Sequence, residues 1–267
     1  MTDFNRNAAA AQYGRPLTRA EAAVVDEGLR AYMLRIYNYM VIGLAITGFA
    51  ALGIYMLSVT NDPNAAYEAA RPLARGTYLT PLGFYLFVSP LKWVVILAPL
   101  GLVFFLSYRI QAMQPATAQI TFWIYAALVG VSLGAIFLIY THSSIVRVFF
   151  ITAASFGALS LWGYTTQRDL TGMGSFLIMG VFGIIIASLV NSFVASTMLQ
   201  WVISVVGVLV FAGLTAYDTQ RLKSEYLHGS MDGDILERSA IMGALSLYLD
   251  FLNLFTMLLQ LLGTRDE

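Results

Sequence analysis

The sequence has 267 residues, of which 58% are hydrophobic and 11% charged, and its mean hydropathy is +0.72. Soluble globular domains contain about 25% charged residues, so this composition excludes an ordinary soluble domain and indicates an integral membrane protein. The formal net charge is zero and there is no basic run, which argues against a nucleic-acid partner, and the absence of cysteine excludes disulfides and cysteine-ligated metals.

Seven apolar stretches are long enough to cross a lipid bilayer, because about 20 helical residues span its hydrocarbon core. In chain order they cover residues 32–57, 86–107, 118–140, 145–165, 174–195, 198–217 and 241–262. The predicted fold is therefore an all-α membrane protein, a seven-transmembrane-helix bundle. Its expected organisation is a hydrophilic cytoplasmic N-terminal segment at 1–31, a transmembrane domain at 32–262 and a short C-terminal tail at 263–267.

Positive charge gathers at the start of the chain, where arginines occupy positions 6, 15, 19, 30 and 35. An excess of Lys and Arg marks the cytoplasmic ends of membrane spans, so the N-terminus is predicted to lie inside. The longest connection, residues 58–85, then lies outside, and we interpret it as a surface connector.

The third stretch contains Gly130-Val131-Ser132-Leu133-Gly134, which matches the Gly-x-Ser-x-Gly pattern of serine nucleophiles. That pattern needs a strand-to-helix turn and a histidine partner. Here the segment is mid-helix, and His142 and His228 fall in predicted loops. Gly130 and Gly134 are instead predicted to let two helices approach closely.

A polar stripe runs along the seventh stretch, where Ser246, Asp250, Asn253 and Gln260 are separated by steps of four, three and seven residues. Such a stripe should face protein or water, and it is a candidate lining for a cation path. Asn191 in the fifth stretch is a further candidate, either as an interhelical hydrogen bond or as part of the same path.

Two acids lie within or at the end of the spans, Asp250 in the seventh and Asp218 at the inner end of the sixth. An antiparallel pair of helices joined by residues 219–240 could bring them together, with Arg109 in the same layer. Two close carboxyls in a poorly hydrated site share a proton, so the pair would act as a proton switch. The alternative is a structural Asp–Arg pair that fixes helix register.

Two segments carry a family resemblance: Ala216-Tyr217-Asp218-Thr219-Gln220 and residues 244–255, with the sequence ALSLYLDFLNLF. They resemble the Bax inhibitor-1 (transmembrane Bax-inhibitor-motif) family. The resemblance implies six helices around a central seventh, a paired-aspartate pH sensor at Asp218 and Asp250, and a latching arginine at Arg109. It also implies a bacterial-type member in the inner or plasma membrane, whose relatives are associated with pH-dependent calcium leak. Some relatives carry a glutamate in the second span, which this sequence lacks.

The expected function is a pH-sensitive calcium (cation) leak channel rather than an enzyme. Ca²⁺ and protons are then the permeant and gating ions, no cofactor is needed, and Asp218 and Asp250 form at most a weak, transient Ca²⁺ site. A non-conducting regulator that binds partner membrane proteins is the alternative. An intramembrane aspartyl protease is a remote third, because Leu247-Tyr248-Leu249 stands where that family has Gly-x-Gly before its aspartate.

Overall fold

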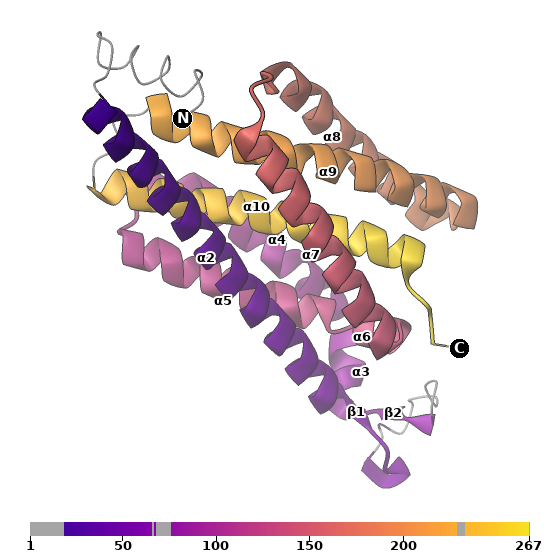
Figure 1. Cartoon of the computed structure of the whole chain (residues 1–267). Helices are drawn as coiled ribbons and strands as arrows, with labels where there is room; N and C mark the ends of the chain where they lie inside the picture. Colours follow the sequence, from indigo (N-terminus) through magenta and orange to yellow (C-terminus); the bar gives the residue numbers. More distant parts are fainter. Residues whose placement is uncertain (1–18, 66, 68–75, 229–232, 267) are drawn as a thin grey trace. The chain divides into compact units, whose positions relative to one another are not determined.

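The computed structural model describes residues 19–65, 67, 76–228 and 233–266 (Figure 1). Residues 1–18 and 267 of the predicted terminal segments, and residues 66 and 68–75 of the predicted outer connection, lie outside this description.

The described chain is dominated by helices. The long ones are α2 (Arg19–Ser58), α4 (Lys92–Arg109), α5 (Pro115–Leu133), α7 (His142–Thr165), α8 (Thr171–Val194), α9 (Thr197–His228) and α10 (Gly233–Leu262). The short α6 (Ile136–Ile139) extends α5. Within the described residues, seven helical segments are long and apolar enough to cross a membrane. This finding confirms the predicted all-α membrane fold; the central position of the seventh helix stays a prediction.

Several helices differ from their apolar stretches in length. α9 continues from the predicted end at 217 to His228, α10 begins at Gly233 instead of 241, and α2 begins at Arg19 instead of 32. Hydropathy marks only the part of a helix that suits hydrocarbon, whereas polar residues with good helix propensity prolong the helix beyond it.

The second span begins later than predicted. Residues Pro81–Phe87 form a separate helix, α3, whose N-cap Thr80 accepts a hydrogen bond from the Gly83 N–H through its Oγ1. Pro90 lies between α3 and α4, and because proline and its preceding residue disfavour a continuous helix, the apolar stretch is split there.

Two compact units make up the chain: Met1–Met40 with Val146–Leu262, called the first unit, and Val41–Ile145 with Gly263–Glu267, called the second. In the second unit, β1 (Val59–Thr60) pairs antiparallel with β2 (Tyr78–Leu79), and a 3-10 turn, η1 (Pro63–Ala65), follows β1. A further 3-10 turn, η3 (Ile110–Ala112), follows α4.

Gly130 in the second unit has the packing role predicted for it. A Cβ added there would lie 2.5 Å from the Thr47 carbonyl oxygen and 2.7 Å from the Ala50 Cβ, both on α2. Since real side chains do not approach so closely, the glycine is required for this helix contact. The serine-nucleophile pattern around Gly130 is thus a packing motif, but it lies at the C-terminal end of α5, where Gly134 is the C-cap, and not in mid-helix as predicted.

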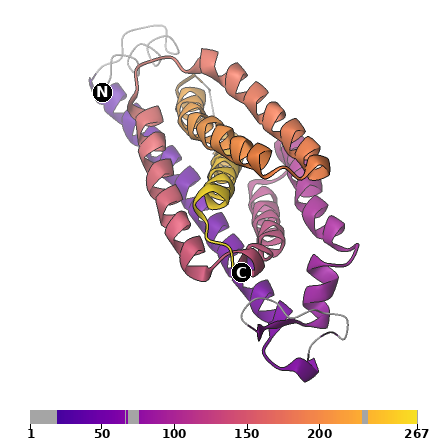
Figure 2. The same cartoon turned by 90° about the vertical axis from the view of Figure 1, so that its right-hand side faces the viewer.

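In the first unit, α9 lies between α8 and α10, as Figures 1 and 2 both show. Small residues bring the helices together: a Cβ on Gly163 of α7 would lie 2.3 Å from the Ala216 carbonyl oxygen of α9, and one on Gly207 of α9 would lie 2.7 Å from Met257 Sδ of α10. These contacts fix the register in which the polar residues of α9 and α10 meet.

Candidate functional site: a carboxyl pair between α9 and α10

Asp218 of α9 and Asp250 of α10 come together in the first unit. Their side chains are in hydrogen-bonding contact, and the two residues are only 7% and 5% exposed. Asp250 Oδ2 is buried and accepts no hydrogen bond from the N–H and O–H groups of the described residues. Two carboxyls make such a contact when one of them carries a proton.

The position of the pair follows from the two helices. Asp218 lies where the apolar part of α9 passes into its polar extension, on the same face as Leu214 and Leu222, which are both buried. Asp250 shares the buried face of α10 with Leu247 and Leu254. Each acid is therefore held in an apolar layer in which ionising both groups together is costly.

Arg221 is the cation that contacts this pair within the first unit. Its Nη1 lies 3.3 Å from Asp218 Oδ1, its Nε lies 3.4 Å from Glu225 Oε1, and its Nη2 donates to Ser246 Oγ at 3.3 Å. The guanidinium also lies 6.0 Å from the Tyr217 ring. Arg221 thus bridges both helices on one side of the carboxyls. Sequence reasoning missed this role, although the i, i+3 spacing from Asp218 is a recognisable signal.

Arg109 does not belong to the unit that holds the carboxyl pair. It is the last residue of α4, it is exposed, and it belongs to the second unit. Its assignment as the latching arginine therefore stays a prediction, whereas an ion pair to Asp218 is made by Arg221.

The other members of the predicted polar stripe form separate contacts. Ser246 accepts the hydrogen bond from Arg221, and Asn253 Nδ2 donates to the Leu249 carbonyl of its own helix at 2.9 Å. Gln260 lies near the opposite end of α10, where its Oε1 accepts hydrogen bonds from Gln200 Nε2 at 2.6 Å and from Ser204 Oγ at 2.7 Å.

Asn191 joins this second polar cluster through Gln200. Its Nδ2 donates to Gln200 Oε1 at 3.0 Å, and its Oδ1 accepts from the Ser196 N–H at the same distance. One glutamine of α9 therefore links α8 to α10. Asn191 and Gln260 were predicted as path-lining residues, and the structure places both in this amide cluster of Asn191, Gln200, Ser204 and Gln260.

A second buried charge on α9 serves a different purpose. Lys223 is 3% exposed, and its Nζ donates to the Tyr164 carbonyl at 2.9 Å and lies 5.3 Å from the Tyr164 ring. Tyr164 is in the last turn of α7, whose carbonyls lack helical partners. A cation is favourable there, so Lys223 caps α7.

The described residues contain no group of three or more His, Asp or Glu side chains placed to hold a metal ion. Asp218 and Asp250 on their own supply fewer ligands than the six to eight oxygens that Ca²⁺ prefers.

The fold and the site together define a multi-pass helical membrane protein with two buried carboxyls in contact between two of its spans. A family model described as "Inhibitor of apoptosis-promoting Bax1" matches residues 29–267, and the chain belongs to this Bax inhibitor-1 family.

Bacterial relatives cover nearly the whole chain. An uncharacterized protein of Rickettsia prowazekii is 44% identical over 250 residues, which are 94% of this chain and 96% of the relative. An uncharacterized protein of Caulobacter vibrioides is 42% identical over 269 residues, covering 100% of both chains. The inner membrane protein YbhL of Escherichia coli is 42% identical over 240 residues, which are 89% of this chain and 93% of the relative. None of these three names indicates an enzymatic activity.

Proposed function

We propose that the protein is a pH-sensitive cation leak channel of the cell membrane, with the N-terminus in the cytoplasm, Ca²⁺ as the permeant ion and the Asp218–Asp250 pair as the gate. The observation that carries this proposal is the hydrogen-bonded contact between two buried carboxyls on adjacent spans. Intramembrane acids are costly and mark ion or proton pathways in most membrane proteins that have them.

Proton loss gives this pair two distinct states. With one shared proton, the carboxyls form a hydrogen bond that ties α9 to α10. Without it, two negative charges about 4 Å apart repel by about 4 kcal/mol at an effective dielectric constant of about 20. That repulsion exceeds the roughly 1 kcal/mol contributed by an ordinary hydrogen bond. The ionised pair therefore favours separation of the helices and attracts cations.

Arg221 supplies the counter-charge in this scheme. Its contacts to Asp218 and Ser246 hold the guanidinium next to the carboxyl pair, and its Nε faces Glu225. When the second carboxyl ionises, Arg221 compensates one charge and leaves the other for a passing cation. Two carboxylates with the Asn253 amide bind Ca²⁺ only weakly, which suits permeation, because a permeant ion must also leave.

The protease alternative finds no support in the backbone at Asp250. α10 is continuous from Gly233 to Leu262, so its peptide groups on both sides of Asp250 are occupied by helical hydrogen bonds. The non-conducting regulator, which would act through partner membrane proteins, is separated from the channel by measuring flux directly.

The experiment is Ca²⁺ flux into liposomes that contain the purified full chain, measured between pH 5 and 8. Asp218→Asn and Asp250→Asn are compared with wild type, and Asp234→Asn, an exposed position at the start of the same helix α10, is the matched control. We expect flux that rises with pH in wild type and control, and a flattened pH dependence in both gate variants. Equal leakage from protein-containing and empty liposomes at every pH would overturn the channel and favour the regulator.

The same assay decides between the two arginines. Arg221→Gln removes the guanidinium that contacts Asp218, so we expect the pH of half-maximal flux to move upward, because the ionised pair loses its counter-charge. Arg109→Gln should leave this midpoint unchanged. If only Arg109→Gln moved it, the latch implied by the family resemblance would replace Arg221.

A further inference from the structure

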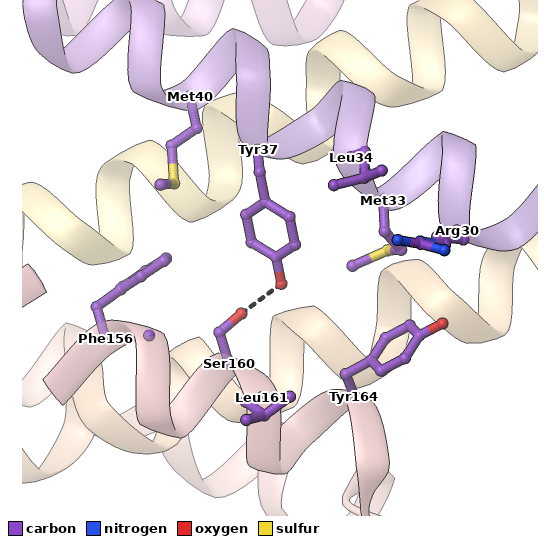
Figure 3. A pocket seen from close by; sticks show the side chains of 10 residues that line it. Arg30, Met33, Leu34, Tyr37, Met40, Phe156, Ser160, Leu161 and Tyr164 are labelled. Atoms are coloured by element: carbon purple, nitrogen blue, oxygen red, sulfur yellow. Dashed lines mark hydrogen bonds between the residues drawn. The ribbon is translucent and has the colours of Figure 1, made fainter. Parts of the chain in front are cut away.

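A cavity of about 510 Å³ lies between α2 and α7 in the first unit (Figure 3). Its walls are largely apolar, with Met33, Leu34 and Met40 from α2 facing Phe156 and Leu161 from α7. The volume is within the roughly 300–1,000 Å³ typical of small-molecule sites. In a protein that spans a membrane, such an apolar cavity between two spans is suited to a hydrocarbon chain.

The length of the cavity matches one leaflet of a bilayer. Its lining on α2 runs from Arg30 to Met40, ten helical steps, or about 15 Å at 1.5 Å per residue. Half of a hydrocarbon core of about 30 Å has this same length. The two helices are antiparallel here: Met40 lies opposite Phe156, and Arg30 lies at the same end as Tyr164 (Figure 3).

An arginine lies at one end of the cavity. Arg30 is exposed, precedes the apolar part of α2, and forms no ion pair within the described part of the chain. The buried Lys223 lies behind the Tyr164 ring, and Asp26 is the acid whose charge acts on both of these residues. Arg30 therefore presents an exposed guanidinium at this end of the cavity, which complements an anion at the membrane surface.

The hydroxyl groups of Tyr37 and Ser160, which line the cavity, already form hydrogen bonds. Tyr37 and Ser160 share a hydrogen bond across the cavity (Figure 3), and Ser160 Oγ lies 2.8 Å from Thr219 Oγ1. Because Thr219 donates to the Thr215 carbonyl, Ser160 donates to Thr219 and Tyr37 donates to Ser160. The Tyr37 and Ser160 hydroxyls are thus paired with protein groups and do not require water.

We propose that this cavity binds one acyl chain of an anionic phospholipid, taken from the leaflet at whose surface α2 begins, with the lipid phosphate paired with Arg30. The apolar walls and the 15 Å length select the chain. The Arg30 guanidinium, which has no ion pair among the described residues, selects the charge of the headgroup. This binding does not depend on whether the protein conducts ions.

Gly157 provides a way to block the cavity. It lines the cavity, and a Cβ added to it would have nothing within 4 Å. Gly157→Leu therefore places a side chain in the space of the acyl chain without a clash at its first atom. Gly183→Leu is the matched control, because Gly183 on α8 is equally open and does not line the cavity. Arg30→Gln removes the charge at its mouth, with the exposed Arg35→Gln on the same helix as control.

The test is native mass spectrometry of the detergent-purified full chain, titrated with phosphatidylglycerol or with phosphatidylcholine of identical acyl chains. In wild type and both controls we expect one tightly held lipid, with phosphatidylglycerol preferred about fivefold, the effect of one basic residue near an anionic headgroup. Gly157→Leu should weaken binding of both lipids about tenfold, the effect of excluding two methylene groups from apolar contact. Arg30→Gln should make the two lipids bind alike.

Two results would overturn the proposal. One is equal binding of the two lipids by wild type, which would mean that only annular lipid is retained. The other is undiminished lipid binding by Gly157→Leu. An unfolding temperature for each variant shows whether the fold is intact, and because Arg30 is exposed, its variant tests the headgroup contact even if Gly157→Leu is unstable.

Discussion

Gly163→Ala should separate α7 from α9, because the contact at this position is with backbone. The new Cβ would lie 2.3 Å from the Ala216 carbonyl oxygen and 2.9 Å from its carbonyl carbon and Cα, whereas ordinary contact begins at 3.4 Å. The helices must therefore move apart by about 1 Å, or strain, at a cost of about 1–3 kcal/mol for an overpacked core.

The movement would also weaken neighbouring hydrogen bonds. Ser160 and Lys223 bond across the same helix pair at 2.8 and 2.9 Å, to Thr219 and to the Tyr164 carbonyl, and a shift of about 1 Å would take both beyond bonding distance. Loss of both adds about 2–4 kcal/mol, and the helix propensity of alanine returns up to about 1 kcal/mol. The expected net destabilisation is about 2–6 kcal/mol.

The assay is thermal unfolding of the purified protein in detergent, with Gly157→Ala as the matched control. Gly157 is on the same helix, and its added Cβ meets nothing within 4 Å, so this variant should be neutral or slightly more stable than wild type. Equal unfolding temperatures for the two variants would refute the inference that the backbone contact at Gly163 holds α7 against α9.

Two further predictions concern the amide cluster and the connection before α8. Gln200→Leu should destabilise the protein by about 1–3 kcal/mol in thermal unfolding, because the Asn191 amide and the Gln260 carbonyl oxygen lose a half-buried partner; an unchanged unfolding temperature would mean that water replaces the glutamine. The pKa of Asp169 lies below its usual value because the Thr171 hydroxyl and N–H bond its carboxylate. A lowered pKa stabilises the fold above the unfolded pKa of about 3.9 and loses that effect as the pH falls through the folded value. The stability advantage of wild type over Asp169→Asn should therefore be present at pH 6 and decrease as the pH falls below about 3.9, and an advantage that does not change with pH would contradict this assignment.

The fold was predictable from hydropathy because every membrane-spanning helix must be apolar over the length of the hydrocarbon core. The C-terminal end of α9 and the N-terminal start of α10 were not predictable, because hydropathy does not distinguish helix from loop for residues outside the hydrocarbon core. The break at Pro90 was readable in principle, but the apolar run continues on both sides of it and hides it.

The contact between Asp218 and Asp250 was predictable from the free-energy cost of exposing an acid to lipid. Two acids near one membrane face, on consecutive helices, avoid that cost when they are buried against each other. The cation was assigned to Arg109 from its expected position at the inner end of the second span and from the family resemblance. Arg221 was overlooked because it lies beyond the apolar stretch, where charged residues are common and do not by themselves indicate a functional site.

The amide cluster shows a different limit of the sequence. Asn191 and Gln260 were recognised as polar residues in apolar helices, but their common partner Gln200 depends on the register of three helices. That register is set by contacts such as Gly207 with Met257, which no single helix pattern encodes.

The capping role of Lys223 has a practical consequence for chemical labelling. The sequence contains two lysines, Lys92 and Lys223. Of these two side chains, Lys223 is buried and bonded to the end of α7, so an amine-reactive reagent reaches Lys92, which is partly exposed at the start of α4. With the labelled site located by peptide mass spectrometry, attachment of a membrane-impermeant reagent to Lys92 in sealed right-side-out vesicles would report on which side of the bilayer α4 begins.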